Sequence, residues 1–120
     1  MAQILAKHRR EPGFGHWRWQ RISAVATLGF MLYFTYLVAS MGPLDYSAAM
    51  TFFAAPQHAV ALAILVIAGM FHAALGVQMI IEDYIPLASG RLALVTIARG
   101  VFAIAAMASL VSVGMIAGLI

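Results

Sequence analysis

The sequence has no cysteine among its 120 residues. This absence excludes disulfide bonds, thiolate zinc sites and cysteine-ligated iron–sulfur clusters within the chain. Charge is also scarce, because only 9% of the residues are charged, whereas about a quarter are charged in a soluble domain. Hydrophobic residues make up 64% of the chain. The composition therefore excludes an ordinary soluble domain and indicates an integral membrane protein.

Three long apolar segments fill most of the chain and predict an all-α fold with three transmembrane helices. We expect one membrane domain, residues 1–120. The expected spans are residues 21–41, 57–84 and 90–119. Gly42 and Pro43 suit the end of the first span, since Gly can take a left-handed conformation and Pro cannot continue a helix. Pro56 suits the first turn of the second span, and Pro86 marks its end.

The first 20 residues are polar and basic, and we expect them to form a short cytoplasmic arm. Pro12, Gly13 and Gly15 oppose a helix there, and Trp17 and Trp19 suit an interfacial aromatic belt. A short basic flank beside a span is typical of a topology signal. The sequence therefore predicts contact with the lipid bilayer and no binding of nucleic acid.

The basic residues also predict the orientation of the chain. They are concentrated before the first span, they are absent from the loop expected at 42–57, and Arg91 follows the second span. The positive-inside rule then places the N-terminus in the cytoplasm and the C-terminus outside. His58, at the end of that loop, is expected to face solvent or lipid headgroups.

The second apolar run, from Ala59 to Ile81, contains His72 near its middle. An imidazole is costly in hydrocarbon unless a partner uses it. It can serve as a polar contact to a Ser, a Thr or a carbonyl of another helix, or as an axial ligand of haem iron. Gly69 and Gly76 lie within about 60° of His72 around the helix, which suits either a flat macrocycle or a closely packed second helix. The glycines do not decide between these interpretations.

His72 is the only histidine deep in any span, so the chain offers a single axial nitrogen. A haem with two histidine ligands would need the other from a partner subunit or a second copy of the chain. Arg21, at the mouth of the first span, suits topology and phospholipid contact, or an anionic group such as a haem propionate. Arg99 could snorkel to the cytoplasmic surface, or pair with Asp83 or a propionate.

Asp83 and Tyr84 close the second span. Asp83 follows His72 by eleven residues, a net rotation of about 20° and a rise of about 16 Å, so both side chains project from nearly the same face. An acid and an aromatic at this place can be an interfacial cap and anchor, although Asp opposes the dipole of a helix C-terminus. Alternatively, the Tyr84 hydroxyl could donate to a carbonyl of a lipid-soluble ligand such as a quinone, with Asp83 positioning it or relaying a proton.

Two motifs carry a resemblance to a known family. One is His-x10-Asp-Tyr at residues 72–84, and the other is Gly-x-x-His-Trp-x-x-Gln-Arg-x-Ser-Ala at residues 13–24. Together they resemble the small haem-bearing membrane anchor of succinate dehydrogenase, the D subunit of respiratory complex II, in its bacterial form. The resemblance covers essentially the whole chain.

The resemblance implies a role for several residues. His72 would be the axial ligand of haem b, whose other axial histidine comes from the companion C anchor subunit, a b-type cytochrome. Arg21 would lie near the propionates. Tyr84 would hydrogen-bond ubiquinone or menaquinone, with Asp83 as its neighbour.

The resemblance also implies partners and a location. The chain would sit in a bacterial inner membrane and anchor a flavoprotein, which holds FAD and oxidises succinate, and an iron–sulfur protein. It would be a subunit of an enzyme, succinate:quinone oxidoreductase of the respiratory chain and the tricarboxylic acid cycle, without holding the succinate chemistry. Two other functions stay open: a proton-relay or transport subunit that uses His72 and Asp83, and a passive, haem-free anchor.

Overall fold

The computed structural model of the chain describes residues 12–86 and 90–120, and within these ranges it is helical apart from short connections. The helices are α2 (Pro12–Met41), α3 (Tyr46–Ala54), α4 (Pro56–Tyr84) and α5 (Arg91–Ile116). Three of them, α2, α4 and α5, are long and apolar enough to cross a membrane, with mean hydropathies of 1.8, 2.4 and 2.0. The prediction of an all-α fold with three membrane spans is confirmed.

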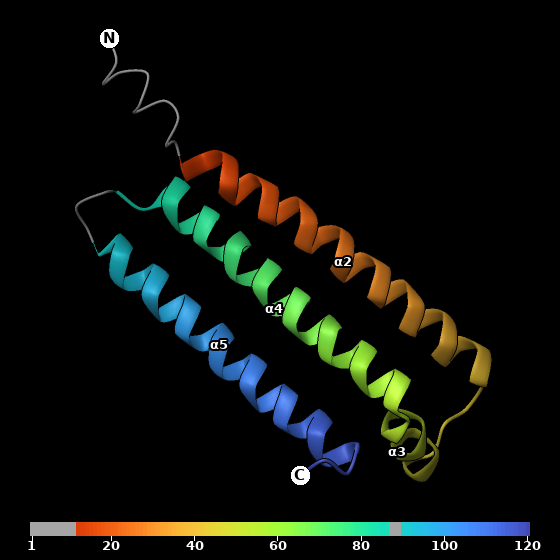
Figure 1. Ribbon diagram of the computed structural model, residues 1–120. Coiled ribbons are helices and arrows are strands. Elements are labelled where there is room, and N and C mark those ends of the chain that lie inside the picture. The colour runs from red at the N-terminus through yellow and green to blue at the C-terminus, as the bar shows by residue number, and fades with distance from the viewer. Residues whose placement is uncertain (1–11, 87–89) are drawn as a thin grey trace.

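The three long helices form a row, with α4 between α2 and α5 and each helix antiparallel to its neighbour (Figure 1). In the part of the chain that the structure describes, α2 and α5 do not pack against each other. A row encloses little, so large apolar side chains such as Val25, Leu28 and Ile104 are exposed on its faces. Exposed apolar surfaces of this extent are typical of contact with a membrane or with other polypeptides.

Helix α2 begins earlier than the sequence predicts. It starts at Pro12, so the expectation of an extended arm is wrong for residues 12–20, while residues 1–11 lie outside the described residues. Proline is tolerated in a first turn, because the N–H that it lacks would have no helical partner there. A glycine inside a helix costs only about 1 kcal/mol relative to alanine. These penalties are too small to stop a helix that is continuous with a long apolar span.

The connection between the first two spans contains a helix where a loop was expected. Gly42 ends α2 in the left-handed region, with φ +73, as predicted. Asp45 then caps α3, because its Oδ1 accepts a hydrogen bond of 2.7 Å from the backbone N–H of Ala48. Phe53 of α3 packs against Phe34 of α2, with ring centroids 6.1 Å apart, and Phe52 joins Phe34 and Ala61 in one core cluster that holds the short helix against the row.

His58 belongs to this packed end of the molecule. Its Nδ1 lies 3.0 Å from the carbonyl oxygen of Phe52, and its ring stacks on the Phe52 ring with centroids 3.9 Å apart. His58 is therefore half-buried, and the prediction that it faces solvent or headgroups is wrong. The imidazole closes the turn between α3 and α4.

Arg91 closes the opposite end of α4. Helix α4 ends at Tyr84, just before Pro86, as the sequence predicts. Arg91 donates from Nε to the carbonyl oxygen of Ile85 at 3.2 Å, and from Nη2 to the carbonyl oxygen of Glu82. These bonds satisfy carbonyls that a helix C-terminus leaves without partners. Helix α5 ends at Ile116, slightly before the expected 119.

Candidate functional site

The central contact between α2 and α4 joins a serine to the mid-span histidine. Ser23 Oγ lies 3.1 Å from His72 Nδ1. Ser23 is only 4% exposed, and its hydroxyl donates a hydrogen bond of 3.1 Å to the carbonyl oxygen of Gln20. The hydroxyl has a single proton, so while it donates to Gln20, Ser23 Oγ can only accept from His72 Nδ1–H. We therefore assign the proton to Nδ1, which leaves the lone pair of Nε2 available to a ligand.

Small residues of α4 let α2 approach on both sides of this contact. A Cβ added to Gly76 would lie 3.6 Å from Gln20 Nε2, and one added to Gly69 would lie 3.9 Å from Thr27 Cγ2. The two glycines were open to two interpretations in the sequence. The structure shows that they face α2, at the turns above and below His72. Their role beside a haem stays a prediction.

Two buried oxygens flank the Ser23–His72 contact. Gln20 Oε1 and Thr27 Oγ1 have no hydrogen-bond partner among the described residues. An unpaired buried acceptor costs about 1–3 kcal/mol. The seam between α2 and α4 is thus a strip of polar atoms in apolar surroundings. Besides the Ser23–His72 hydrogen bond, it contains a contact of 3.3 Å between His16 Nε2 and the carbonyl oxygen of Leu75.

An apolar groove opens next to this seam. It has a volume of about 250 Å³, and Trp19, Ser23, Ala68 and Phe71 are among the residues that line it. Its small alanine and its tryptophan offer a flat apolar surface one turn from His72. Part of a macrocycle could lie against such a surface, with the remainder enclosed by another polypeptide.

The donor set fits haem iron better than a bare metal ion. Among the described residues, no group of three His, Cys, Asp or Glu side chains could hold a metal ion. A porphyrin brings four equatorial nitrogens of its own, so one imidazole from this chain suffices on one side of the iron. Metal-bound histidines usually donate their other N–H to a fixed acceptor. His72 already does so, through Nδ1 and Ser23.

Arg21 is not brought to His72. Arg21 precedes Ser23, the residue that contacts His72, by two positions. Two positions correspond to a rotation of about 160° around α2, so Arg21 projects from the opposite face of the helix. Its side chain is exposed, and its guanidinium carbon lies 5.4 Å from the centre of the Trp17 ring. A cation held over an indole face is partly immobilised. Arg21 is thus available to an anionic group that approaches from outside the row.

Asp83 and Tyr84 lie exposed at the end of α4, and Tyr84 is 80% exposed. Neither side chain makes a hydrogen bond within the described ranges. Successive residues point about 100° apart on a helix, so the two do not converge. A quinone at Tyr84 would need its remaining walls from another polypeptide.

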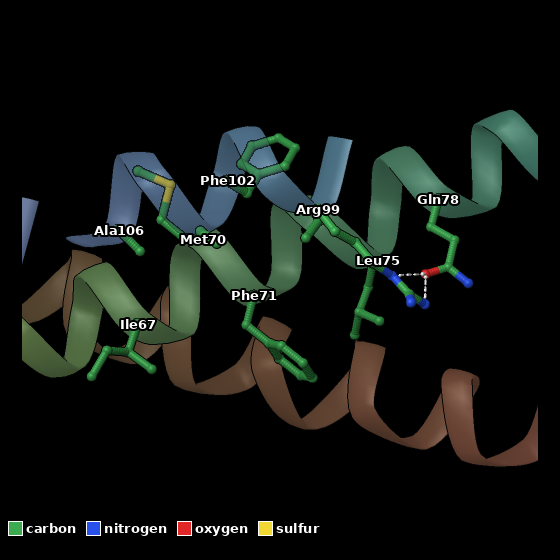
Figure 2. A pocket seen from close by; sticks show the side chains of 10 residues that line it. Ile67, Met70, Phe71, Leu75, Gln78, Arg99, Phe102 and Ala106 are labelled. Atoms are coloured by element: carbon green, nitrogen blue, oxygen red, sulfur yellow. Dashed lines mark hydrogen bonds between the residues drawn. The ribbon is translucent and has the colours of Figure 1, made fainter. Parts of the chain in front are cut away.

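A polar chain that was not predicted from the sequence links α4 to α5. Gln78 Oε1 accepts two hydrogen bonds from Arg99, 2.7 Å from Nη2 and 3.2 Å from Nε, as Figure 2 shows. Gln78 Nε2 in turn donates to Glu82 Oε1 at 2.7 Å. Gln78 and Glu82 are four residues apart on α4, a spacing that the sequence does display. Arg99 therefore binds Gln78, and not Asp83 as one of the sequence alternatives had it.

Comparisons with known proteins agree with the two sequence motifs. A family model described as "Succinate dehydrogenase/Fumarate reductase transmembrane subunit" matches residues 3–114. A curated relative, the succinate dehydrogenase hydrophobic membrane anchor subunit of Rickettsia bellii (strain RML369-C), is 34% identical over 73 residues, which is 61% of this chain and 58% of the relative. The match thus spans a little over half the length of that relative.

The close approach of α2 and α4 can be tested at Gly76. We expect Gly76→Leu to destabilise the protein by about 1–3 kcal/mol, because a branched side chain would displace Gln20 and separate the helices. Gly76→Ala should be tolerated, since its Cβ would meet Gln20 at an ordinary contact distance. The measurement is the midpoint of thermal unfolding of the purified membrane complex.

Gly100 of α5 provides the matched control. A Cβ at Gly100 has nothing within 4 Å, so Gly100→Leu should leave the midpoint close to that of the wild type. A Gly76→Leu protein as stable as the Gly100→Leu protein would show that α2 and α4 are not closely packed at this point.

Proposed function

This chain belongs to the succinate dehydrogenase/fumarate reductase transmembrane subunit family, and we propose that it is the hydrophobic membrane anchor of a succinate:quinone oxidoreductase, holding one side of a shared haem b and part of the quinone site. The observation that carries the haem proposal is the Ser23–His72 hydrogen bond of 3.1 Å. It supports the tautomer with the proton on Nδ1, in which Nε2 can bind iron at mid-span.

His72 would bind the haem iron through Nε2, and Ser23 would hold the proton on Nδ1. When bound, the haem would supply a site that takes up and releases single electrons. The chain has one histidine deep in a span, so the opposite axial histidine would come from a C anchor subunit, a b-type cytochrome. The exposed apolar faces of the row are suited to packing against such a subunit.

Arg21 would bind a haem propionate. A guanidinium has the geometry to form two parallel hydrogen bonds with a carboxylate. Trp17 keeps the Arg21 side chain against α2, near the end of the span where a propionate would leave the hydrocarbon. Since Arg21 projects away from α4, the propionate would approach from the outer side of α2, where the partner subunit would also lie.

Tyr84 and Asp83 would contribute to quinone reduction. The Tyr84 hydroxyl would donate a hydrogen bond to a quinone carbonyl, which favours the charge that develops on that oxygen as electrons arrive. Asp83, exposed beside it, would accept protons from water and pass them on. Reduction of one ubiquinone or menaquinone to the quinol takes two electrons, delivered by the partner subunits, and two protons.

The proposed complex contains two further subunits outside the membrane. A flavoprotein with FAD would oxidise succinate, and an iron–sulfur protein would carry the electrons to the quinone. In this arrangement the N-terminus and the turn between α4 and α5 face the cytoplasm of a bacterium, and the C-terminus lies on the outer side of the inner membrane. The excess of basic residues at the N-terminus and at Arg91 supports this orientation.

A haem-free anchor is the second candidate, and the same hydrogen bond favours it. A histidine that only packs between helices would also pair with a serine, because a buried imidazole needs a partner. In the haem-binding anchor, His72 Nε2 would bind iron, whereas in the haem-free anchor it would bind no metal. Removal of the imidazole separates them.

We expect His72→Ala to abolish the reduced b-type absorption band of the purified complex, because the iron loses an axial ligand. The measurement is the visible spectrum before and after dithionite. His58→Asn is the control, since an amide nitrogen can replace Nδ1 at the Phe52 carbonyl without touching the haem. Normal haem content in the His72→Ala complex would reject the haem proposal and leave the passive anchor.

Ser23→Ala should retain the haem and make its midpoint potential more positive. A hydrogen bond donated by Nδ1–H increases electron density on the imidazole and stabilises ferric iron, so its loss favours the ferrous form. A redox titration of the dithionite band measures this shift. Ser23→Thr keeps the acceptor oxygen and should keep the wild-type potential. Equal potentials in the Ala and Thr variants would show that Ser23 does not act on His72.

Tyr84→Phe should lower the rate of quinone reduction by roughly threefold to tenfold, the effect of one hydrogen bond. Succinate oxidation with an artificial dye acceptor should be unchanged, because that chemistry lies in the flavoprotein. Tyr46→Phe, at the other end of the row and 81% exposed, should leave both rates unchanged. If Tyr84→Phe reduced both activities equally, the cause would be failed assembly and not the quinone site.

A further inference from the structure

Arg99 carries a positive charge and makes no direct ion pair with an acid in residues 12–86 and 90–120. It lies on α5, about 12 Å of helix rise beyond Arg91, and arginine stays protonated in proteins. Its hydrogen bonds go to the neutral amide oxygen of Gln78. The nearest acid in this chain of contacts, Glu82, binds the other end of the same amide. A charge inside a span almost always has a partner, so Arg99 is expected to find its anion outside the chain.

An apolar groove between α4 and α5 begins at Arg99 and Gln78 (Figure 2). Its volume is about 390 Å³, and the rest of its lining is aliphatic or aromatic, including Ile67, Phe71 and Phe102. The groove is thus polar at one end and apolar along its length. The polar end is the one nearer the turn between α4 and α5.

The length of the groove matches half a bilayer. Gln78 and Ile67, at its two ends on α4, are eleven residues apart, a rise of about 16 Å. The hydrocarbon core of a bilayer is about 30 Å thick. A transmembrane helix of a partner would follow α4 and α5 across the full core. A lipid of a single leaflet has a headgroup at the surface and an acyl chain that ends near the midplane.

We propose that this groove binds one anionic phospholipid of the leaflet at the turn between α4 and α5, with its phosphate on Arg99 and one acyl chain along Phe102 and Ile67. Gln78 fixes the guanidinium by accepting from Nε–H and one Nη2–H. The N–H groups that remain would bind the phosphate, for which a guanidinium has suitable geometry. Its polar residues, Gln78 and Arg99, take no part in the haem and quinone proposals, although Ile67 and Phe71 line both this groove and the one beside His72.

The amide at position 78 has a specific consequence. A carboxylate at this position would neutralise Arg99 within the chain and remove the need for an external anion. Gln78 orients the guanidinium without neutralising it. The variant Gln78→Glu should therefore weaken binding of the phospholipid while Arg99 is still present.

The test uses the intact purified complex, delipidated in detergent and titrated with phosphatidylglycerol or with phosphatidylcholine of the same acyl chains. Native mass spectrometry counts the bound lipids. The wild type should bind one phosphatidylglycerol per copy of this chain about tenfold more tightly than phosphatidylcholine. Arg99→Gln and Gln78→Glu should each remove this preference, and Arg99→Lys should keep most of it. Arg18→Gln, at an exposed arginine of α2, is the matched control and should keep all of it.

A phosphatidylglycerol with a diazirine in its acyl chain then locates the site. Cross-links in the wild type should map to residues 67–78 and 99–106 and be lost in Arg99→Gln. Ala106→Phe, which fills the apolar part of the groove, should also reduce them. An unchanged lipid preference in Arg99→Gln would overturn the proposal. So would an absence of cross-links in the groove, which would indicate that a polypeptide covers it, or their displacement by a short-chain quinone, which would identify a quinone as the occupant.

Discussion

The hydrogen bond between Ser23 and His72 is the contact on which the arrangement of α2 and α4 depends. Hydrophobic attraction does not distinguish one helix register from another inside a lipid, because the acyl chains are as apolar as the side chains. A polar pair does distinguish them, since a slip of one residue would separate His72 from Ser23 and leave the imidazole without this partner. Interhelical hydrogen bonds in membranes contribute only about 0.6 kcal/mol on average. The effect of this one is therefore on geometry: it sets the register and supports the tautomer of His72 with the proton on Nδ1.

The row of three helices explains why every candidate site in the chain is incomplete. A closed bundle would surround a ligand, but in a row only α4 has neighbours on two sides. His72 offers one nitrogen, Arg21 projects away from α4, and Tyr84 is 80% exposed. Each of these groups can form one wall of a site. Function in this chain therefore belongs to the surfaces that it shares with other molecules.

The sequence allowed prediction of the spans and of the position of His72 near the middle of one of them. It did not allow prediction of the contacts between helices. Length and hydropathy determine whether a segment can cross a membrane, and the angular position of the glycines relative to His72 follows from helix geometry alone. Helix geometry alone does not tell which helix packs against these glycines, because that depends on the register of α2. The pairing of Gln78 with Arg99 was missed because it depends, in the same way, on the register of α5 against α4. Helix α3 was missed although Asp45 is a recognisable cap, because a nine-residue helix needs tertiary contacts such as that of Phe53 with Phe34 to persist.

The two arginines of α5 show how depth changes what a charge requires. Arg91 lies at the end of the row, where the carbonyls of Glu82 and Ile85 at the C-terminus of α4 accept its N–H groups. These carbonyls carry the negative end of the helix dipole, so they compensate part of its charge. Arg99 lies two turns deeper, where the carbonyls of α4 are already used within the helix, and only a side chain can reach it. Gln78 supplies an oxygen but no negative charge. The same residue type is thus compensated by backbone carbonyls at the surface, whereas within the span its hydrogen bonds go to a neutral amide, which is why we propose an external anion there.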